Sequence, residues 1–275
     1  MEKPPAKPLK PMSAGKKTRF GIISALAEEQ EGLIQAMQNP IRHLYGMREY
    51  TVGTLWNVEA VTVLSRIGKV AAAMTATMLV EKFGVTHILF TGVAGSADAA
   101  VRVGDVVIAE TLVQHDMDAA PLFPRFQIPL MGLALLPSDL AMSSRLAGAA
   151  TIFLEAMSGP TVHRGLIGSG DQFIHDGMRL ATLKNALPGL LAVEMEGAAV
   201  AQVCFELGIP FAVIRTISDN ANENAATDFM HFVKTVASRY AFGIVEQFCR
   251  DWVGAQEAAE EPVSSLVPDP RVDTN

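Results

Sequence analysis

The sequence of 275 residues has few cysteines and no long uninterrupted apolar run. The two cysteines, Cys204 and Cys249, lie inside helical patterns without metal-ligand spacing, so no disulfide framework or zinc site is expected. No apolar run reaches the 18 residues that a membrane span needs. The net charge is −7 and no basic patch is dense, which argues against nucleic-acid binding. These absences indicate a cytoplasmic protein.

Hydrophobic residues make up 49% of the chain, which is enough for one large buried core. We expect a single domain over residues 18–254, because no linker or internal repeat interrupts it. Residues 1–17 are basic and proline-rich but lack the apolar segment of a signal peptide. Residues 255–275 are acidic and contain three prolines. Both ends are predicted to be disordered tails.

Strand patterns alternate with helix patterns along the domain, which favours a layered α/β fold. A hairpin is expected from residues 49–55 and 58–64, and a glycine-bearing turn at residues 91–96. The other expected strands are 19–26, 85–90, 101–113, 162–168, 190–193 and 211–217. The expected helices are 68–83, which Gly84 closes, 138–157, which Ser138 caps, and 176–187, 197–207 and 227–252.

Charged residues follow several buried-looking strands, where α/β proteins place their binding sites. Glu28-Glu29 follows the first strand, Glu194 and Glu196 follow residues 190–193, and Ser218-Asp219 ends a strand that contains Arg215. Acidic residues are also ordinary in the first turn of a helix, and Ser and Asp are common in turns. An arginine inside an apolar strand needs a carboxylate partner or a site. Spacing alone leaves both interpretations open.

Other motifs are weak. The TGVAGS segment at residues 91–96 is not a dinucleotide or P-loop fingerprint, and its glycines indicate a tight turn or a close backbone approach. His115, Asp116 and Asp118 lack the further ligands that a metal site requires. The segment around Ser169 has no GxSxG pattern, which argues against a Ser-His-Asp hydrolase.

Taken together, seven segments resemble the purine nucleoside phosphorylase and nucleosidase superfamily, and within it the 5′-methylthioadenosine/S-adenosylhomocysteine nucleosidases. They occur in the order of the family and span almost the whole domain. The segments are GIISALAEE at 21–29, SRIGKVAAA at 65–73, TGVAG at 91–95, VGDVV at 103–107, GLIGSGDQFI at 165–174, VEMEGAA at 193–199 and RTISD at 215–219. The resemblance implies a three-layer αβα sandwich around a mixed, mostly central β-sheet.

The resemblance also implies hydrolysis of the N-glycosidic bond of an adenine thionucleoside, with no metal or other cofactor. Glu29 would activate the attacking water. Asp219 would protonate N7 of adenine so that the base leaves neutral, and Ser218 would help to orient it. Such a cleavage passes through an oxocarbenium-like sugar, which needs an acid at the leaving group and a base at the water.

By the same resemblance, Glu196 would hold the ribose hydroxyls, with Met195 and Arg215 behind it. Ser65 and Arg215 would help to hold the nucleophilic water. A carboxylate near the ribose also stabilises the positive charge that develops on the sugar. Glu194 is left without a role in this scheme and is expected to be structural.

The purine and the 5′-substituent would meet apolar residues. Phe173 would stack near the purine and the backbone of Ile174 would read its edge, while Leu26 and Phe229 would line the alkylthio pocket. The loop at residues 119–129 would close this pocket, partly from a second subunit, so a homodimer is expected. The apolar residues of this loop could instead fold back on their own core.

Three alternatives remain open. One is a phosphate-dependent purine nucleoside phosphorylase, for which Arg66, in place of a glycine of the family, is the only supporting residue. Another is hydrolysis of aminodeoxyfutalosine or a different 6-aminopurine nucleoside. Ala27, Val93 and the proline-rich segment 115–132 depart from the family pattern, which leaves the 5′-substituent open. The last is a nucleoside-binding protein without activity, against which the intact Glu29, Glu196 and Asp219 argue.

Overall fold

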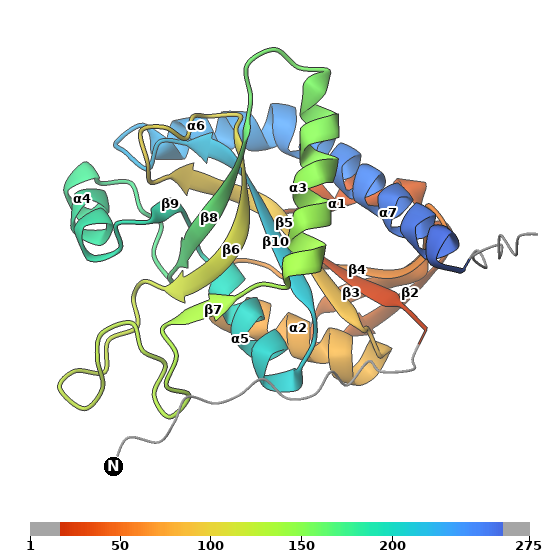
Figure 1. The fold of residues 1–275 in the computed structure, drawn as a ribbon, viewed down its shortest axis with the longest axis horizontal. Coiled ribbons are helices and arrows are strands. Elements are labelled where there is room, and N and C mark those ends of the chain that lie inside the picture. The colour runs from red at the N-terminus through yellow and green to blue at the C-terminus, as the bar shows by residue number, and fades with distance from the viewer. Residues whose placement is uncertain (1–16, 261–275) are drawn as a thin grey trace, which may run out of the picture.

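The computed structural model describes residues 17–260, in which ten strands form one mixed sheet with helices on both faces (Figure 1). The predicted α/β fold is confirmed. The strands are β1 Arg19–Ser24, β2 Gln38–Tyr45, β3 Arg48–Leu55, β4 Val58–Leu64, β5 His87–Ser96, β6 Val106–Gln114, β7 Leu135–Pro137, β8 Val162–Ser169, β9 Leu190–Glu194 and β10 Phe211–Asp219. The helices are α1 Ala27–Ala36, α2 Lys69–Phe83, α3 Leu140–Glu155, α4 Gly177–Ala186, α5 Gly197–Leu207, α6 Ala225–Phe232, a π-helix Val233–Ala237 and α7 Ser238–Glu260.

The sheet has an open part and a closed part that share β5. The open part runs from β5 through β1, β4 and β3 to the edge strand β2. In the closed part, β5 pairs with β10 on one side and β9 on the other, and β6 and β8 complete the circuit. Five strands therefore form a ring without a free edge, and the short β7 pairs with β6 outside it.

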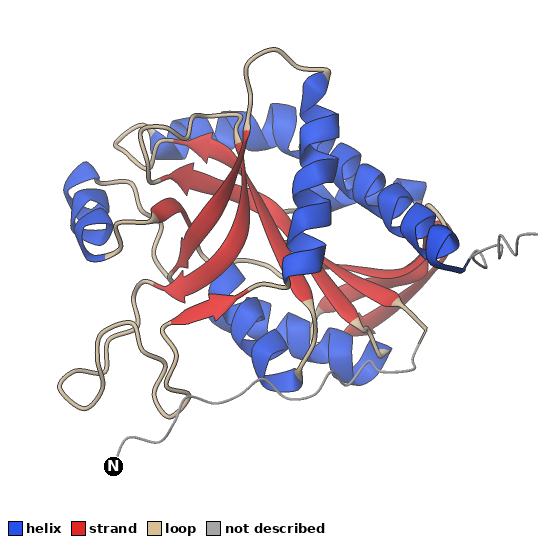
Figure 2. Ribbon diagram, in the orientation of Figure 1, coloured by secondary structure: helices blue, strands red, loops and turns tan. Residues whose placement is uncertain are grey.

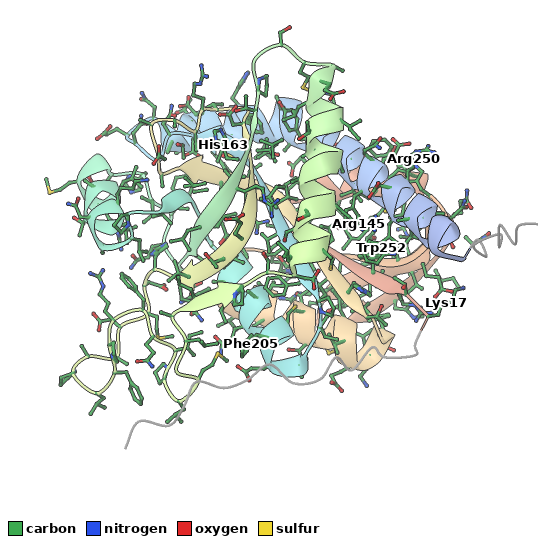
Figure 3. All side chains as sticks on the ribbon, in the orientation of Figure 1. Lys17, Arg145, His163, Phe205, Arg250 and Trp252 are labelled. Atoms are coloured by element: carbon green, nitrogen blue, oxygen red, sulfur yellow. The ribbon has the colours of Figure 1, made fainter. Side chains whose placement is uncertain are left out.

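Helices cover the sheet in two layers, with α1, α3 and α7 on one face and α2 and α5 on the other (Figure 2). Strand β1 shows how the sequence supplies both layers. Phe20 and Ile22 pack under α1, α3 and α7, whereas Ile23 packs under α2 and α5, because successive side chains of a strand alternate between faces. On the outside, Arg145 of α3 lies over the ring of Trp252 of α7, 5.5 Å from its centroid (Figure 3).

The predicted helices 68–83 and 197–207 are confirmed as α2 and α5. Helix α2 ends at Gly84 with φ +61°, a left-handed conformation that favours glycine. The predicted hairpin is confirmed as β3 and β4, which pair antiparallel. These elements carry strong local signals, namely helix-ending glycines and a two-residue turn between alternating strands.

Other expectations were wrong. Residues 91–96 are not a turn but the second half of β5. Asp139, not Ser138, caps α3, and its Oδ1 accepts a hydrogen bond from the amide of Met142. The predicted closing helix 227–252 is divided into α6, a π-helical turn and α7. Strands β2 and β7 were not expected.

Helix α7 continues to Glu260, past the predicted domain end at residue 254. The rest of both predicted tails, residues 1–16 and 261–275, lies outside the described residues. Within residues 17–260, no helix is both long and apolar enough to cross a bilayer. The same residues contain no group of three or more His, Cys, Asp or Glu side chains arranged to hold a metal.

Candidate active site

A cavity of about 240 Å³ lies at the carboxyl ends of β1, β5, β9 and β10, beside the loop that follows β8. Eight of the eleven predicted site residues line it. They are Leu26, Phe173, Ile174, Met195, Glu196, Ser218, Asp219 and Phe229. Glu29, Ser65 and Arg215 are outside this lining. The cavity is also lined by Ala25, Ile67, Val93, Ala94, Gln172, Val193 and Glu194, which the sequence did not single out as substrate contacts.

Glu29 lies directly behind this lining, in the first turn of α1, and is 1% exposed. Its Oε2 accepts hydrogen bonds from the amides of Ala25 and Leu26, each at 3.1 Å, and both of these residues line the cavity. Its Oε1 has no hydrogen-bond partner among the described residues. Burial raises the pKa of Glu29 to about 7, against the lowering effect of these amides and of Arg215. This is a pKa suited to a general base near neutral pH.

Asp219 ends β10 with its carboxyl group buried at the cavity wall. Its Oδ2 accepts from Ser218 Oγ at 2.8 Å, and its Oδ1 accepts from the amide of Ala221 at 2.8 Å. Burial raises the pKa of Asp219 above its ordinary value, although both hydrogen bonds oppose this shift. The direction is the one that a carboxylic acid needs in order to donate a proton.

Glu196 precedes α5, lines the cavity and is 5% exposed. Its Oε1 accepts from the amide of Gly68 at 2.8 Å, just before α2 begins. Burial, together with the nearby charge of Glu194, raises the pKa of Glu196. A carboxylate fixed through one oxygen is suited to accept hydroxyl donors through the other. Gly68 was not predicted as a partner, because 128 positions separate the two residues.

Arg215 pairs with Glu194 and makes no hydrogen bond to Glu196, on which it acts through its charge. Its Nε and Nη2 donate to Glu194 Oε2 at 3.2 and 2.7 Å, and its Nη1 donates to the carbonyls of Phe90 and Ile214. The guanidinium lies 4.1 Å from the centroid of the Phe90 ring. Arg215 is 1% exposed and donates its hydrogen bonds to these partners. It therefore influences the cavity through its contact with Glu194 and through its positive charge.

Glu194 is the centre of this buried network. Besides Arg215, its carboxylate accepts from Ser169 Oγ, from the amide of Glu196 at 3.1 Å and from the amide of Gly197 at 2.8 Å. It therefore joins the ends of β8 and β9 and the middle of β10 to the start of α5. These contacts give Glu194 the structural position that the sequence left undefined, and one side of the residue also faces the cavity.

The glycines of β5 make room for functional side chains. A Cβ added at Gly92 would lie 3.2 Å from Cζ and Nη1 of Arg215, and one added at Gly95 would lie 2.8 Å from Oδ1 of Asp219. Glycine is thus required here for close approach, as in other strands that a side chain or ligand contacts. This agrees with one of the two interpretations of the TGVAGS segment and excludes the turn.

Aromatic and apolar side chains form the rest of the lining. The rings of Phe173 and Phe229 meet edge to face, with centroids 5.9 Å apart, so the loop after β8 and helix α6 approach each other across the cavity. Leu26, Ile67 and Val93 add aliphatic surface. A flat heterocycle fits against such rings, and an apolar substituent fits against the aliphatic side chains.

The remaining predicted site residue, Ser65, and Arg66, which alone supports the phosphorylase alternative, have other contacts. Ser65 is fully buried, and its Oγ bonds the carbonyls of Ser24 at 3.3 Å and Arg66 at 2.8 Å. Arg66 is exposed and donates from Nη2 to the carbonyl of Met47 at 2.8 Å. No lysine or arginine lines the cavity. The site thus combines buried carboxyl groups, three of them with raised pKa values in or behind the lining, with apolar walls and no basic lining residue among the described residues.

Comparison with known proteins places this site in a family. The sequence model of the phosphorylase superfamily matches residues 19–250. A 5′-methylthioadenosine/S-adenosylhomocysteine nucleosidase from Shewanella frigidimarina is 36% identical over 215 residues, which is 78% of this chain and 92% of that protein. The nucleosidase of the same name from Neisseria meningitidis, solved in complex with methylthio-immucillin-A, has a TM-score of 0.79 at 33% identity over 85% of this chain and 99% of that one.

A futalosine hydrolase from Helicobacter pylori is also similar, with a TM-score of 0.77 and 31% identity over 85% of this chain and 98% of that one. The nucleosidase relatives make the chain an N-glycosyl hydrolase. The residues matched by the family model, 19–250, include every residue of the cavity lining. The chain belongs to the 5′-methylthioadenosine/S-adenosylhomocysteine nucleosidases of the phosphorylase superfamily.

Proposed function

We propose that the protein hydrolyses the N-glycosidic bond of methylthioadenosine, adenosylhomocysteine or both, releasing adenine and the thioribose. The observation that carries the proposal is Glu29, a buried carboxyl group behind the cavity wall with a pKa near 7 and an oxygen without a partner. That oxygen can accept a hydrogen bond from water and remove its proton. Relatives of the same name, one of them bound to methylthio-immucillin-A, support this substrate class.

Asp219 is the proposed acid. Its raised pKa favours the protonated carboxyl, which would deliver a proton to N7 of adenine, and Ser218 fixes the carboxyl through its 2.8 Å hydrogen bond. Protonation turns adenine into a better leaving group, since the base departs neutral. Phe173 and Phe229 supply ring surface on which the purine can pack.

Glu196 is the proposed ribose ligand. Its Oε1 is held by the Gly68 amide, and among the described residues no hydrogen bond occupies its Oε2. Ribose hydroxyls would donate to this carboxylate, and its negative charge would stabilise the oxocarbenium-like sugar. The Glu194–Arg215 pair behind it fixes the backbone at the start of α5 and offsets part of the local negative charge.

Water is favoured over phosphate as the nucleophile. A phosphate dianion is normally bound by arginines or by several backbone amides. Here Arg215 is committed to Glu194, Arg66 to the Met47 carbonyl, and no basic residue lines the cavity. The 5′-substituent would meet Leu26, Ile67 and Phe229, which suits an alkylthio group.

The test is adenine release from methylthioadenosine, adenosylhomocysteine, aminodeoxyfutalosine, adenosine and inosine, each with and without phosphate. We expect release from the thionucleosides at a rate that phosphate does not change. Release that requires phosphate would contradict hydrolysis. Faster release from aminodeoxyfutalosine than from either thionucleoside would shift the assignment to the futalosine hydrolase relatives.

We further propose that the protein is a homodimer. Of the apolar residues in the loop 119–131, Ile128 packs into the core, whereas Leu122 and Leu130 are 83% and 91% exposed. Val70 on α2 is 81% exposed as well. Apolar surface of this kind is normally covered by a partner. Light scattering should give twice the mass of one chain, and Leu122→Glu with Leu130→Glu should lower it.

A further inference from the structure

Three residues outside the cavity lining form a closed ring of hydrogen bonds. Lys69 Nζ donates to Asp116 Oδ1 at 2.6 Å. Asp116 Oδ2 accepts from the amide of Asp171 at 2.9 Å. Asp171 Oδ1 in turn accepts from the amide of Lys69 at 2.7 Å. Each member is thus bonded to the other two. The sequence pattern around His115 and Asp118 gives no reason to expect this arrangement, since the three residues are far apart in the chain.

The ring joins the start of α2 to the segments after β6 and β8, two strands that pair with each other as far as Gln114 and Ser169. Lys69 is the first residue of α2, Asp116 follows β6, and Asp171 follows β8. Lys69 Nζ also donates to Gln114 Oε1 at 3.1 Å. The side chains of Lys69 and Asp116 are only 16% and 22% exposed, so their ion pair is less screened than a surface pair.

Asp116 stays ionised at neutral pH. Burial opposes its ionisation, but the hydrogen bonds from Lys69 and from the Asp171 amide outweigh burial and hold the pKa of Asp116 below its ordinary value. Hydrogen bonds in which one partner is charged are shorter and stronger than neutral ones. The ring therefore fixes the relative positions of its three segments.

Two of these segments act on proposed substrate contacts: one holds Glu196 and the other contains Phe173. The amide of Gly68, directly before Lys69, donates to Glu196 at 2.8 Å. Gly68 has φ +99°, and a Cβ added to it would lie 3.2 Å from Asp171 Oδ1, so the ring packs directly against it. Phe173, the proposed purine contact, lies two residues after Asp171. A shift of the ring would move both the donor that holds Glu196 and the base of the Phe173 loop.

We propose that Lys69, Asp116 and Asp171 are positioning residues that orient the ribose-binding carboxylate Glu196 through Gly68. The inference rests on the proposed function for the identity of the ribose ligand. None of the three touches the cavity, so their effect on substrate passes through Glu196 and the loop after β8. The orientation of the Glu196 carboxylate matters most for ligands that donate hydrogen bonds to it. The ribose hydroxyls are therefore the appropriate probe.

The test uses Lys69→Met and Asp116→Asn in the full chain, with calorimetric dissociation constants for 7-deazaadenosine, its 3′-deoxy analogue and free adenine. The 7-deaza base has no N7 to protonate, so it reports binding without turnover. Each variant should bind 7-deazaadenosine about 10-fold more weakly than wild type, which is a typical coupling between linked groups. Each should bind the 3′-deoxy analogue and adenine within about 3-fold of wild type. Lys69→Arg should restore most of the difference.

Two controls separate positioning from general damage. Arg145→Met removes an ion pair with Asp251 between α3 and α7 and should leave all three constants unchanged. The double variant Lys69→Met with Asp116→Asn should be no worse than either single variant, because members of one network are not additive. Equal weakening for all three ligands would overturn the proposal. A different outcome is that the variants show the expected ratios of dissociation constants while wild-type protein releases no adenine from thionucleosides. That result would refute the proposed function and leave the positioning role of the ring standing.

Discussion

Replacement of Glu29 by glutamine tests both the base and its burial. Glutamine keeps the size of the side chain and an oxygen that can accept from the amides of Ala25 and Leu26, but it cannot ionise. The reaction would lose its base, and a positioned base contributes roughly 10²–10⁴-fold to rate. We therefore expect Glu29→Gln to lower kcat at least about 100-fold while the dissociation constant of adenine changes little.

The same substitution should change stability in a pH-dependent way. Burial raises the pKa of Glu29 from its ordinary 4.5 to about 7 in the folded protein. Below pH 4.5 the carboxyl is neutral in both states and carries no penalty. As pH rises to 7, the unfolded chain ionises first, so the folded state loses stability relative to it. A difference of about 2.5 in pKa corresponds to about 3 kcal/mol, which is fully present above pH 7.

The assay is thermal unfolding of wild type, Glu29→Gln and Glu28→Gln at pH 5.0 and pH 8.5. About 2.5 kcal/mol of this penalty develops between the two pH values, which in a domain of this size corresponds to roughly 5–10 °C in Tm. Tm of Glu29→Gln relative to wild type should therefore rise by that amount between the two pH values. The exposed neighbour Glu28 is the matched control and should show no such change. A Tm difference that is the same at both pH values would refute a buried, high-pKa Glu29.

Three further substitutions test the neighbouring groups. Asp219→Asn should reduce adenine release at least about 100-fold. It should affect hydrolysis of 4-nitrophenyl riboside much less, since that leaving group needs no proton. Equal losses for the two substrates in steady-state kinetics would argue against the acid role. Arg215→Met leaves the Glu194 charge buried without its partner, and urea unfolding should show a loss of about 3–5 kcal/mol. Gly92→Ala places a methyl group 3.2 Å from the Arg215 guanidinium, and we expect about 1–3 kcal/mol of destabilisation by the same method. Unchanged unfolding curves for either variant would show that the guanidinium is not tightly packed.

The sequence allowed much of the site to be predicted, because strand ends are identifiable locally. Apolar runs that stop at Glu196 or at Ser218-Asp219 mark positions where an α/β sheet places its ligands, and these residues do line the cavity. The resemblance added the order of the segments and Glu29, whose location after β1 could not by itself be distinguished from an ordinary first-turn helix charge.

What could not be predicted depended on contacts between distant segments. Glu194 and Glu196 are two residues apart, and only the geometry at the start of α5 determines that Glu194 meets Arg215. Gly92 suggests a turn when only its neighbours in the sequence are considered. The Arg215 side chain, which requires a glycine at this position, lies 123 positions further along the chain. Strand β2 has almost no buried residue and thus lacks the alternation that identifies strands.

The division of the sheet has a mechanical consequence for the site. Asp219 and Glu194 belong to β10 and β9, two strands of the closed ring, and Glu196 follows β9 directly. A strand of a closed ring cannot slip in register unless its neighbours move with it. Glu29, by contrast, follows β1 in the open part of the sheet. The carboxyl groups proposed to contact adenine and ribose thus follow strands of the closed ring, whereas the proposed base follows a strand of the open part. We therefore expect substitutions beneath α1 to affect the proposed base more than the carboxyl groups that follow β9 and β10.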